Sequence, residues 1–80
     1  MTIKPIVTEK AVMLIESQNT LEFEVPKEQT KPEIRRELES LLKVKIGKMK
    51  TLVQGNKKYV YAKLKKEFPA MDVATKLGLI

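Results

Sequence analysis

The side chains best suited to bind a ligand in this chain are nine lysines between residues 43 and 66, a stretch without aspartate or glutamate. Residues 41–80 hold ten basic and two acidic side chains, whereas residues 1–40 hold six basic and eight acidic ones. The net charges of the two halves are therefore +8 and −2, which add up to the +6 of the whole chain. A lysine cluster without compensating acids is typical of a surface that binds a polyanion. The alternative is the solvated face of a basic protein.

The absence of arginine from this cluster indicates the kind of contact it makes. Lysine carries a mobile point charge, whereas arginine presents a planar fork that also matches the edges of bases. Lysine therefore suits contacts with a phosphate backbone better than sequence-specific reading of bases. If six of these lysines contact duplex phosphates, the log–log slope of affinity against salt is expected to be about −5.

Two tyrosines lie among the lysines, and their spacing puts Tyr59 and Tyr61 on one face of a β-strand. Aromatic rings beside basic residues on a strand can stack unpaired bases, as in RNA-recognition modules. Those modules place glycine and phenylalanine within the strand, and the segment 58–62 has neither. The alternative is that both rings pack beneath a helix.

Groups for catalysis or metal binding are scarce. Histidine and cysteine are absent, which removes the usual general base, the commonest metal ligand, the thiol nucleophile and any disulfide. The segment Thr8-Glu9-Lys10 has no nucleophile–base pair and is better explained as a helix start, whose free N–H groups can receive a phosphate. The glutamates between residues 22 and 39 follow element surfaces rather than a ligand loop, and the three glycines are isolated. We therefore predict no enzymatic activity, no cofactor and no metal.

Size and hydropathy predict one domain spanning residues 1–80. The chain is 42% hydrophobic, which is ordinary for a folded domain of this length. Its longest apolar run, residues 11–15, is far shorter than the ~20 residues of a membrane-spanning helix. The first residues carry no signal-peptide pattern. We expect a cytoplasmic protein that does not insert into a membrane.

The N-terminal half predicts an edge strand, a helix and a second strand. Residues 3–7 are extended and limited to an edge by their proline. Thr8 is a suitable N-cap for a helix that ends at residues 17–19. Strict alternation over residues 20–25 then predicts a half-buried strand. Its core-facing side chains are expected to be Leu21, Phe23 and Val25.

A second helix is predicted over residues 30–42. Thr30 and Glu33 form a capping box at its start. An apolar face follows at helical spacing, made by Ile34, Leu38, Leu41 and Leu42. The solvent side is expected to hold Arg35, Arg36, Glu37 and Glu39.

The most basic segment reads as a β-hairpin. The alternation over residues 44–54 changes phase, and one extra residue at Gly47 restores a continuous core face, so we predict a β-bulge there. Residues 54–56 carry a turn signal, and residues 58–64 form the return strand. The bulge is expected to place four lysines on one face: Lys43, Lys45, Lys48 and Lys50.

A short closing helix is predicted over residues 71–77, with Gly78 as its C′ residue. Short antiparallel strands interleaved with helices indicate an α+β fold, a small antiparallel sheet covered by helices. We favour a ferredoxin-like, split β-α-β plait.

An ordered set of motifs carries a family resemblance. The motifs are Ile6-Val7-Thr8-Glu9-Lys10-Ala11, Asn19-Thr20-Leu21-x-Phe23-x-Val25, Thr30-Lys31-x-Glu33-Ile34, Val44-x-Ile46, Thr51 and Lys57-Lys58. From about residue 3 to the C-terminus this set resembles the universal large-subunit ribosomal protein twenty-three family. The brief turn at residues 54–56 is similar to that of compact, archaeal-type members, whereas bacterial-type members carry a long loop there.

The resemblance implies a structural protein that binds large-subunit rRNA at the rim of the polypeptide exit tunnel. It implies that the chain is a monomer within the ribosome, next to ribosomal protein twenty-nine, and docks nascent-chain factors such as signal recognition particle. The rRNA-binding residues expected on this basis are Lys4, Thr8, Lys10, Asn19, Lys31, Lys48, Lys50, Thr51, Gln54, Asn56, Lys57 and Lys58. The protein-docking residues expected are Glu9, Leu42 and Lys43.

Two other functions compete with a non-catalytic rRNA-binding protein. One is a free-standing module that binds single-stranded RNA through Tyr59 and Tyr61. Substituting both tyrosines separates the two hypotheses, because only the module loses RNA binding without losing its fold. The third hypothesis, a small enzyme, requires a catalytic group that the sequence does not display.

Overall fold

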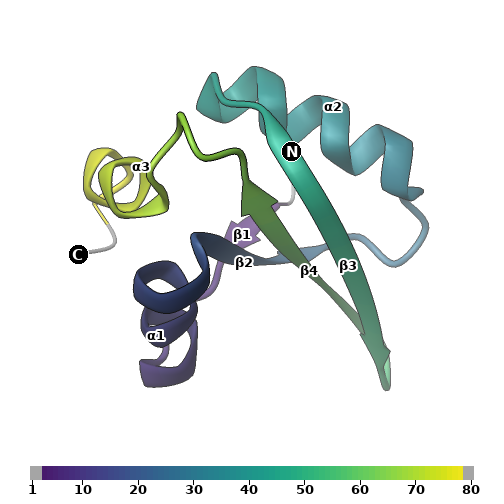
Figure 1. Cartoon of the computed structure of the whole chain (residues 1–80). Coiled ribbons are helices and arrows are strands. Elements are labelled where there is room, and N and C mark those ends of the chain that lie inside the picture. The colour runs from purple at the N-terminus through teal and green to yellow at the C-terminus, as the bar shows by residue number, and fades with distance from the viewer. Residues whose placement is uncertain (1–2, 79–80) are drawn as a thin grey trace.

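The structure is a computed structural model that describes residues 3–78, so residues 1–2 and 79–80 of the expected domain lie outside the described part. Seven elements follow one another along the chain (Figure 1). They are β1 (Lys4–Pro5), α1 (Glu9–Gln18), β2 (Thr20–Val25), α2 (Lys31–Leu42), β3 (Ile46–Gln54), β4 (Lys57–Leu64) and α3 (Ala70–Lys76).

The four strands form one antiparallel sheet in the order β1-β2-β4-β3. Both β2 and β3 run antiparallel to β4, so they are parallel to each other, and α2 connects them across the inserted strand. This is the split β-α-β arrangement, and the predicted α+β class is confirmed. The expected edge strand is also confirmed, because β1 pairs only with β2.

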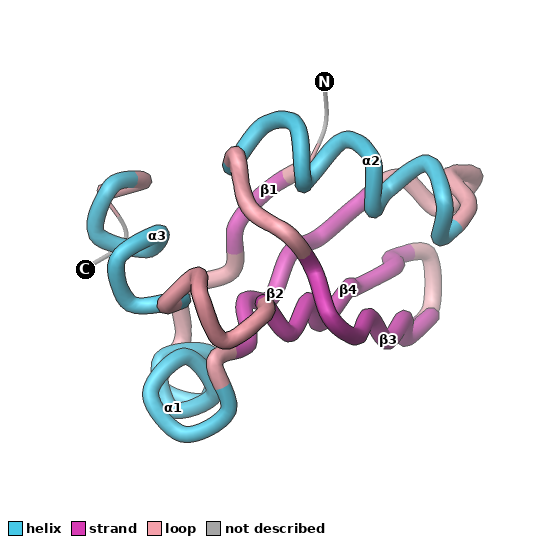
Figure 2. The backbone as a smooth tube through the Cα atoms, turned by 45° about the horizontal axis from the view of Figure 1, so that its top comes forward, coloured by secondary structure: helices cyan, strands magenta, loops and turns pink. Residues whose placement is uncertain are grey.

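The three helices cover different parts of the sheet. Figure 1 shows α2 along one face, whereas α1 and α3 lie next to each other at the end of the sheet away from the β3–β4 turn. Figure 2 shows the same division from a second direction. The helices and the inner face of the sheet share a single hydrophobic cluster. Its most deeply buried large side chains are Leu21, Phe23, Ile34, Leu38, Ile46 and Val60.

The predicted signals at both helix starts are confirmed. The backbone N–H of Ala11 donates to the hydroxyl oxygen of Thr8 over 3.0 Å, which caps α1. At the start of α2, the carboxylate of Glu33 accepts from the backbone N–H of Thr30 at 3.1 Å and from its hydroxyl at 2.9 Å. The backbone hydrogen bond of Thr30 is the main reason why the pKa of Glu33 is lowered.

The β-bulge at Gly47 is confirmed, because the register of β3 against β4 shifts between Ile46 and Lys48. A bulge disrupts the strand ladder locally. Side chains of α2 bind the backbone here: Arg35 donates to the carbonyl oxygens of Ile46 and Gly47, and Glu39 accepts from the N–H of Ile46 at 2.9 Å. Arg35 and Glu39, expected on the solvent side, keep side chains that are 42% and 33% exposed, but their polar ends bind this backbone.

Glu37 is also turned away from open solvent, contrary to expectation. It is half-buried, and its carboxylate accepts a 2.7 Å hydrogen bond from the side-chain amide of Gln29 in the loop before α2. Of the four residues expected on the solvent side of this helix, Arg36 is exposed, and the other three are half-buried. The helix therefore uses its polar residues to hold the loop before it and the strand after it.

The β3–β4 turn consists of Gly55 and Asn56, as predicted. Gln54 pairs with Lys57 across it, and Gly55 has a φ of 62°, as the first central residue of a type II′ turn requires. The strand β3 begins at Ile46 rather than at residue 44. Lys43 instead ends α2 in the left-handed region, with a φ of 56°.

This later start changes the expected lysine face. Lys43 and Lys45 precede β3, so of the four lysines predicted to share one strand face, only Lys48 and Lys50 lie within the strand. The closing helix is confirmed, and Gly78 has a φ of 75° at the C′ position. Among the described residues, no helix has the length and hydropathy that a membrane crossing requires.

Candidate nucleic-acid interface

The face of the sheet opposite α2 gathers four exposed lysines, Lys48, Lys50, Lys57 and Lys63, which we call the basic face. Strand register brings them together, because Lys48 pairs with Lys63, and Lys57 pairs with Gln54. Side chains alternate between the two faces along each strand, so the lysines point outward while Val60 and Ala62 of β4 point into the core. The basic face is therefore a direct product of the hairpin register.

The lysines of the basic face are free of acidic partners. Within residues 3–78, the single ion pair joins Arg35 and Glu39, at 3.9 Å. The four ammonium groups therefore remain available to an external anion. Their charges add on one exposed surface, which attracts a polyanion most strongly at low salt.

Tyrosines mark the boundary between the basic face and an acidic strip on β2. Tyr61 pairs with Lys50 on one side and Glu22 on the other, and Tyr59 pairs with Leu52 and Glu24. Burial, and then the neighbouring carboxylate of Glu22, raise the pKa of Tyr61. The phenol of Tyr61 therefore stays protonated at neutral pH.

A groove of about 380 Å³ separates α1 from the basic face. The helix contributes Lys10, Leu14 and Gln18 to one wall. The sheet contributes the other wall, made by Thr20, Lys48, Lys50, Tyr61 and Lys63. The structure thus brings together three residues of the expected rRNA-binding set, Lys10, Lys48 and Lys50, and adds Lys63, a member of the lysine cluster that was not in that set.

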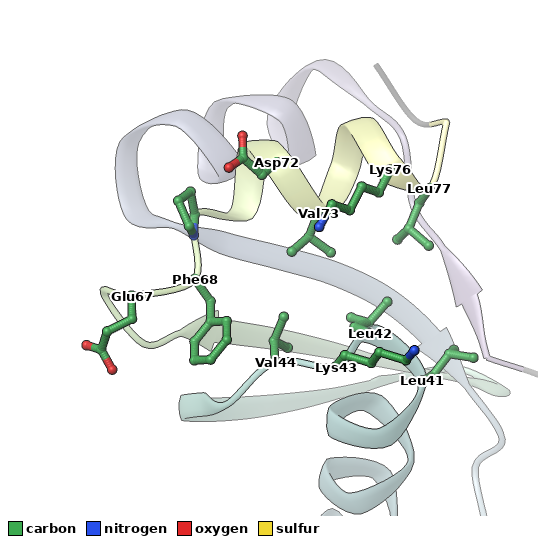
Figure 3. Close-up of a pocket in the computed structure, with 11 residues that line it drawn as sticks. Leu41, Leu42, Lys43, Val44, Glu67, Phe68, Asp72, Val73, Lys76 and Leu77 are labelled. Carbon is green, nitrogen blue, oxygen red and sulfur yellow. The ribbon is translucent and has the colours of Figure 1, made fainter.

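A second groove, of about 480 Å³, lies between the C-terminal end of α2 and α3 (Figure 3). Leu41 and Leu77 are 51% and 41% exposed at its edges. Its apolar lining is Leu41, Leu42, Val44, Phe68, Pro69, Val73 and Leu77. Its charged lining is Lys43, Glu67, Asp72 and Lys76.

A family model named Ribosomal protein L23 matches residues 1–75. The chain belongs to the ribosomal protein L23 family. It is therefore a large-subunit ribosomal protein that acts in translation, and the family is structural rather than enzymatic. This confirms the family resemblance and the prediction that the chain is not an enzyme. Ribosomal RNA and other ribosomal components are the partners that membership implies.

Three of the expected rRNA-binding residues of this L23-family chain lie away from the basic face. Thr51 and Lys58 follow the core parity of β3 and β4, and the ammonium group of Lys58 donates to the backbone oxygen of Gln29 over 2.6 Å. Lys31 lies at the start of α2 beside the bulge, in a depression that Gly47 also lines. Contacts between these residues and RNA stay predictions.

Three more residues of that set lie near the hairpin turn. Gln54 and Asn56 are exposed at the turn itself, where Gln54 has the parity of the basic face. Lys4 lies on the edge strand and lines a shallow depression with Asn56 and Lys57. Glu24 and Glu28 line the same depression, so its charge is mixed.

Thr8 and Asn19 have structural roles that the sequence only partly indicated. Thr8 caps α1, as described above. The side-chain amide of Asn19 donates to the backbone oxygens of Leu64, at 3.2 Å, and Phe68, at 3.1 Å. Its side-chain oxygen accepts from the N–H of Ala70. The only sequence signal for this role was an asparagine directly after a helix, where the left-handed region is common.

The expected docking residues fall into two places. Leu42 and Lys43 both line the α2–α3 groove, whereas Glu9 lies exposed in the first turn of α1 and is not part of its lining. The contribution of α3 to this groove was missed. No local pattern could have indicated it, because the two walls are separated by more than twenty residues of chain.

Proposed function

We propose that this chain binds large-subunit rRNA through the basic face and Lys10, as a structural protein at the rim of the polypeptide exit tunnel. The observation that carries the proposal is a set of exposed lysines, free of carboxylate partners, on one face of the β3–β4 hairpin. Such a surface neutralises phosphates without reading sequence. The strand register holds the lysines at fixed spacing, so the protein can hold neighbouring RNA helices in a fixed arrangement.

The test is retention on the large ribosomal subunit during washes at rising salt. A triple variant, Lys48→Gln, Lys50→Gln and Lys63→Gln, is expected to dissociate at lower salt than the natural protein. The matched control changes Lys27, Lys65 and Lys66 to Gln, which removes the same charge outside the basic face. Two of these control lysines belong to the same basic stretch of sequence, so the comparison tests the face rather than the stretch.

Equal loss from both triple variants would contradict a role for the basic face and would leave only a general effect of net charge. Salt-sensitive binding to free RNA without retention on subunits would favour the alternative, a free-standing module. The two tyrosines share one strand face, as that alternative requires, but only Tyr61 lines the groove beside α1.

We further propose that the α2–α3 groove binds protein partners, namely ribosomal protein twenty-nine or nascent-chain factors such as signal recognition particle. Its support is an open apolar lining whose charged residues are two lysines, Lys43 and Lys76, and two acids, Glu67 and Asp72. Changing Leu41 and Leu77 to Ser is expected to weaken recruitment of ribosomal protein twenty-nine. Met13→Ser is the control, because Met13 is 66% exposed on α1, away from the groove. Glu9 is proposed as a separate docking point.

We also propose that the chain is a compact, archaeal-type member of the family and that it acts as a single domain. The two-residue turn at Gly55 and Asn56 supports a compact, archaeal-type member, since it leaves no loop to extend from the hairpin. The shared hydrophobic cluster supports one rRNA-binding domain over residues 1–80, acting as a monomer within the ribosome. Sedimentation of the free protein measures its oligomeric state, and we expect the mass of one chain.

A further inference from the structure

The groove between α1 and the basic face has features that backbone binding alone does not require. Phosphate contacts need only exposed cations, yet this groove has depth, an aromatic ring from β4 and an apolar side chain from α1. Leu14 and Tyr61 come from its two walls, and four lysines surround them: Lys10, Lys48, Lys50 and Lys63.

We propose that this groove binds one unpaired nucleotide of the RNA, with its base between Leu14 and Tyr61 and its flanking phosphates on the surrounding lysines. The inference rests on the proposed rRNA binding and assigns a particular ligand to one part of that interface. A bulged or looped nucleotide fits, because its base is free to leave the helix. A base-paired nucleotide does not, because its base is held within the stack.

The four lysines place positive charge on three of the elements that border the base site. Lys10 comes from α1, Lys48 and Lys50 from β3, and Lys63 from β4. None of the residues that line the groove is acidic, although Glu22 lies beside Tyr61 on β2. The backbone on both sides of an extruded nucleotide therefore meets ammonium groups, while the base meets an aromatic and an apolar surface.

The two tyrosines are distinguished by their surroundings. Tyr61 is half-buried in the groove, where its cross-strand neighbours are Lys50 and Glu22. Tyr59 is half-buried on the same face but pairs with Leu52 and Glu24, outside the groove. A stacked base is therefore expected on Tyr61 and not on Tyr59. Stacking tolerates any base, so the site selects an unpaired nucleotide rather than a sequence.

The test uses tyrosine fluorescence, since the chain has two tyrosines and no tryptophan. In the Tyr59→Phe variant, Tyr61 is the only tyrosine and reports on the groove. Two RNA hairpins are compared that differ only by one unpaired nucleotide in the stem. We expect the bulged hairpin to quench Tyr61 and to bind roughly ten-fold more tightly than the fully paired one. In the Tyr61→Phe variant, Tyr59 is expected to keep its fluorescence with both hairpins.

Alanine variants provide an independent readout. Tyr61→Ala and Leu14→Ala are expected to abolish the preference for the bulged hairpin, whereas Tyr59→Ala keeps it. Circular dichroism confirms that each variant is folded, and Tyr61→Leu replaces Tyr61→Ala if the smaller side chain destabilises the sheet.

The outcomes separate this inference from the function on which it rests. Equal affinity for both hairpins, without a change in Tyr61 fluorescence, overturns the nucleotide site and leaves phosphate binding in place. Failure of both hairpins to bind at low salt overturns rRNA binding by this face as well.

Discussion

The side-chain oxygen of Asn19 accepts a 2.6 Å hydrogen bond from the backbone N–H of Ala70, the first residue of α3. The N-cap position of α3 is occupied by Pro69, whose side chain has no acceptor. Asn19 therefore supplies the cap from a position 51 residues earlier in the chain. Its amide group also donates to the loop between β4 and α3, so one side chain fixes the position of α3 against the end of α1.

Asn19→Ala is expected to destabilise the protein by roughly 2–4 kcal/mol. The substitution removes the cap of α3 and the hydrogen bonds from the Asn19 amide to three backbone oxygens. It also places alanine in the left-handed region, where Asn19 has a φ of 52°. Urea denaturation measures the change. Asn19→Gly separates the two causes, because glycine accepts the backbone conformation and loses only the side chain. A glycine variant as stable as the natural protein would mean that the bond to Ala70 contributes nothing.

Glu39→Ala is expected to lower the free energy of unfolding by about 1–3 kcal/mol. It leaves the N–H of Ile46 without its partner at the bulge and removes the carboxylate near Arg35. Hydrogen exchange at the Ile46 amide is expected to accelerate more than exchange elsewhere in β3. Arg36→Ala on the exposed side of the same helix is the control, expected to stay within about 0.5 kcal/mol. Equal effects of the two variants would contradict the role of α2 at the bulge.

Lys57 and Lys58 are adjacent in sequence but are expected to have different effects. Lys57 belongs to the basic face, so Lys57→Gln should reduce the salt slope of RNA binding by about 0.9 and leave stability unchanged. Lys58 is half-buried and bonded to the backbone of Gln29, so Lys58→Gln should lower stability by about 1 kcal/mol. Filter binding at several salt concentrations and urea denaturation give the two quantities. A larger slope change for Lys58 would show that its ammonium group leaves Gln29 for RNA.

Acidification is expected to weaken the start of α2 through Glu33. The pKa of Glu33 is lowered in the folded chain, so the unfolded chain binds the proton more readily and stability rises with pH in this range. The contribution is complete above the unfolded pKa of about 4.3 and is lost as pH falls through the lower folded pKa. Glu33→Gln is expected to flatten the pH dependence of unfolding below about pH 5. Glu16→Gln, an exposed residue of α1, controls for the loss of one carboxylate. An identical pH dependence in both variants would argue against the cap.

The sequence by itself determined most of the elements and their ends. Thr8 and Thr30 indicated the starts of two helices, and alternation over residues 20–25 predicted a strand. Gly47 indicated the β-bulge, and Gly55 indicated the hairpin turn. These features depend on backbone preferences and on the periods of helix and strand, which act over a few residues, so they can be read locally. The basic charge of the hairpin and the family motifs were likewise present in the order of residues.

Only the tertiary structure decided which of these side chains work together. It joined Lys10 of α1 to Lys63 of β4 across one groove, and it brought the ammonium group of Lys58 to the backbone oxygen of Gln29. It also placed α3 beside the end of α2 to form the apolar groove. Each of these arrangements depends on packing between elements far apart in the chain. That packing is set by the shape of the shared core and leaves no periodic trace in the sequence.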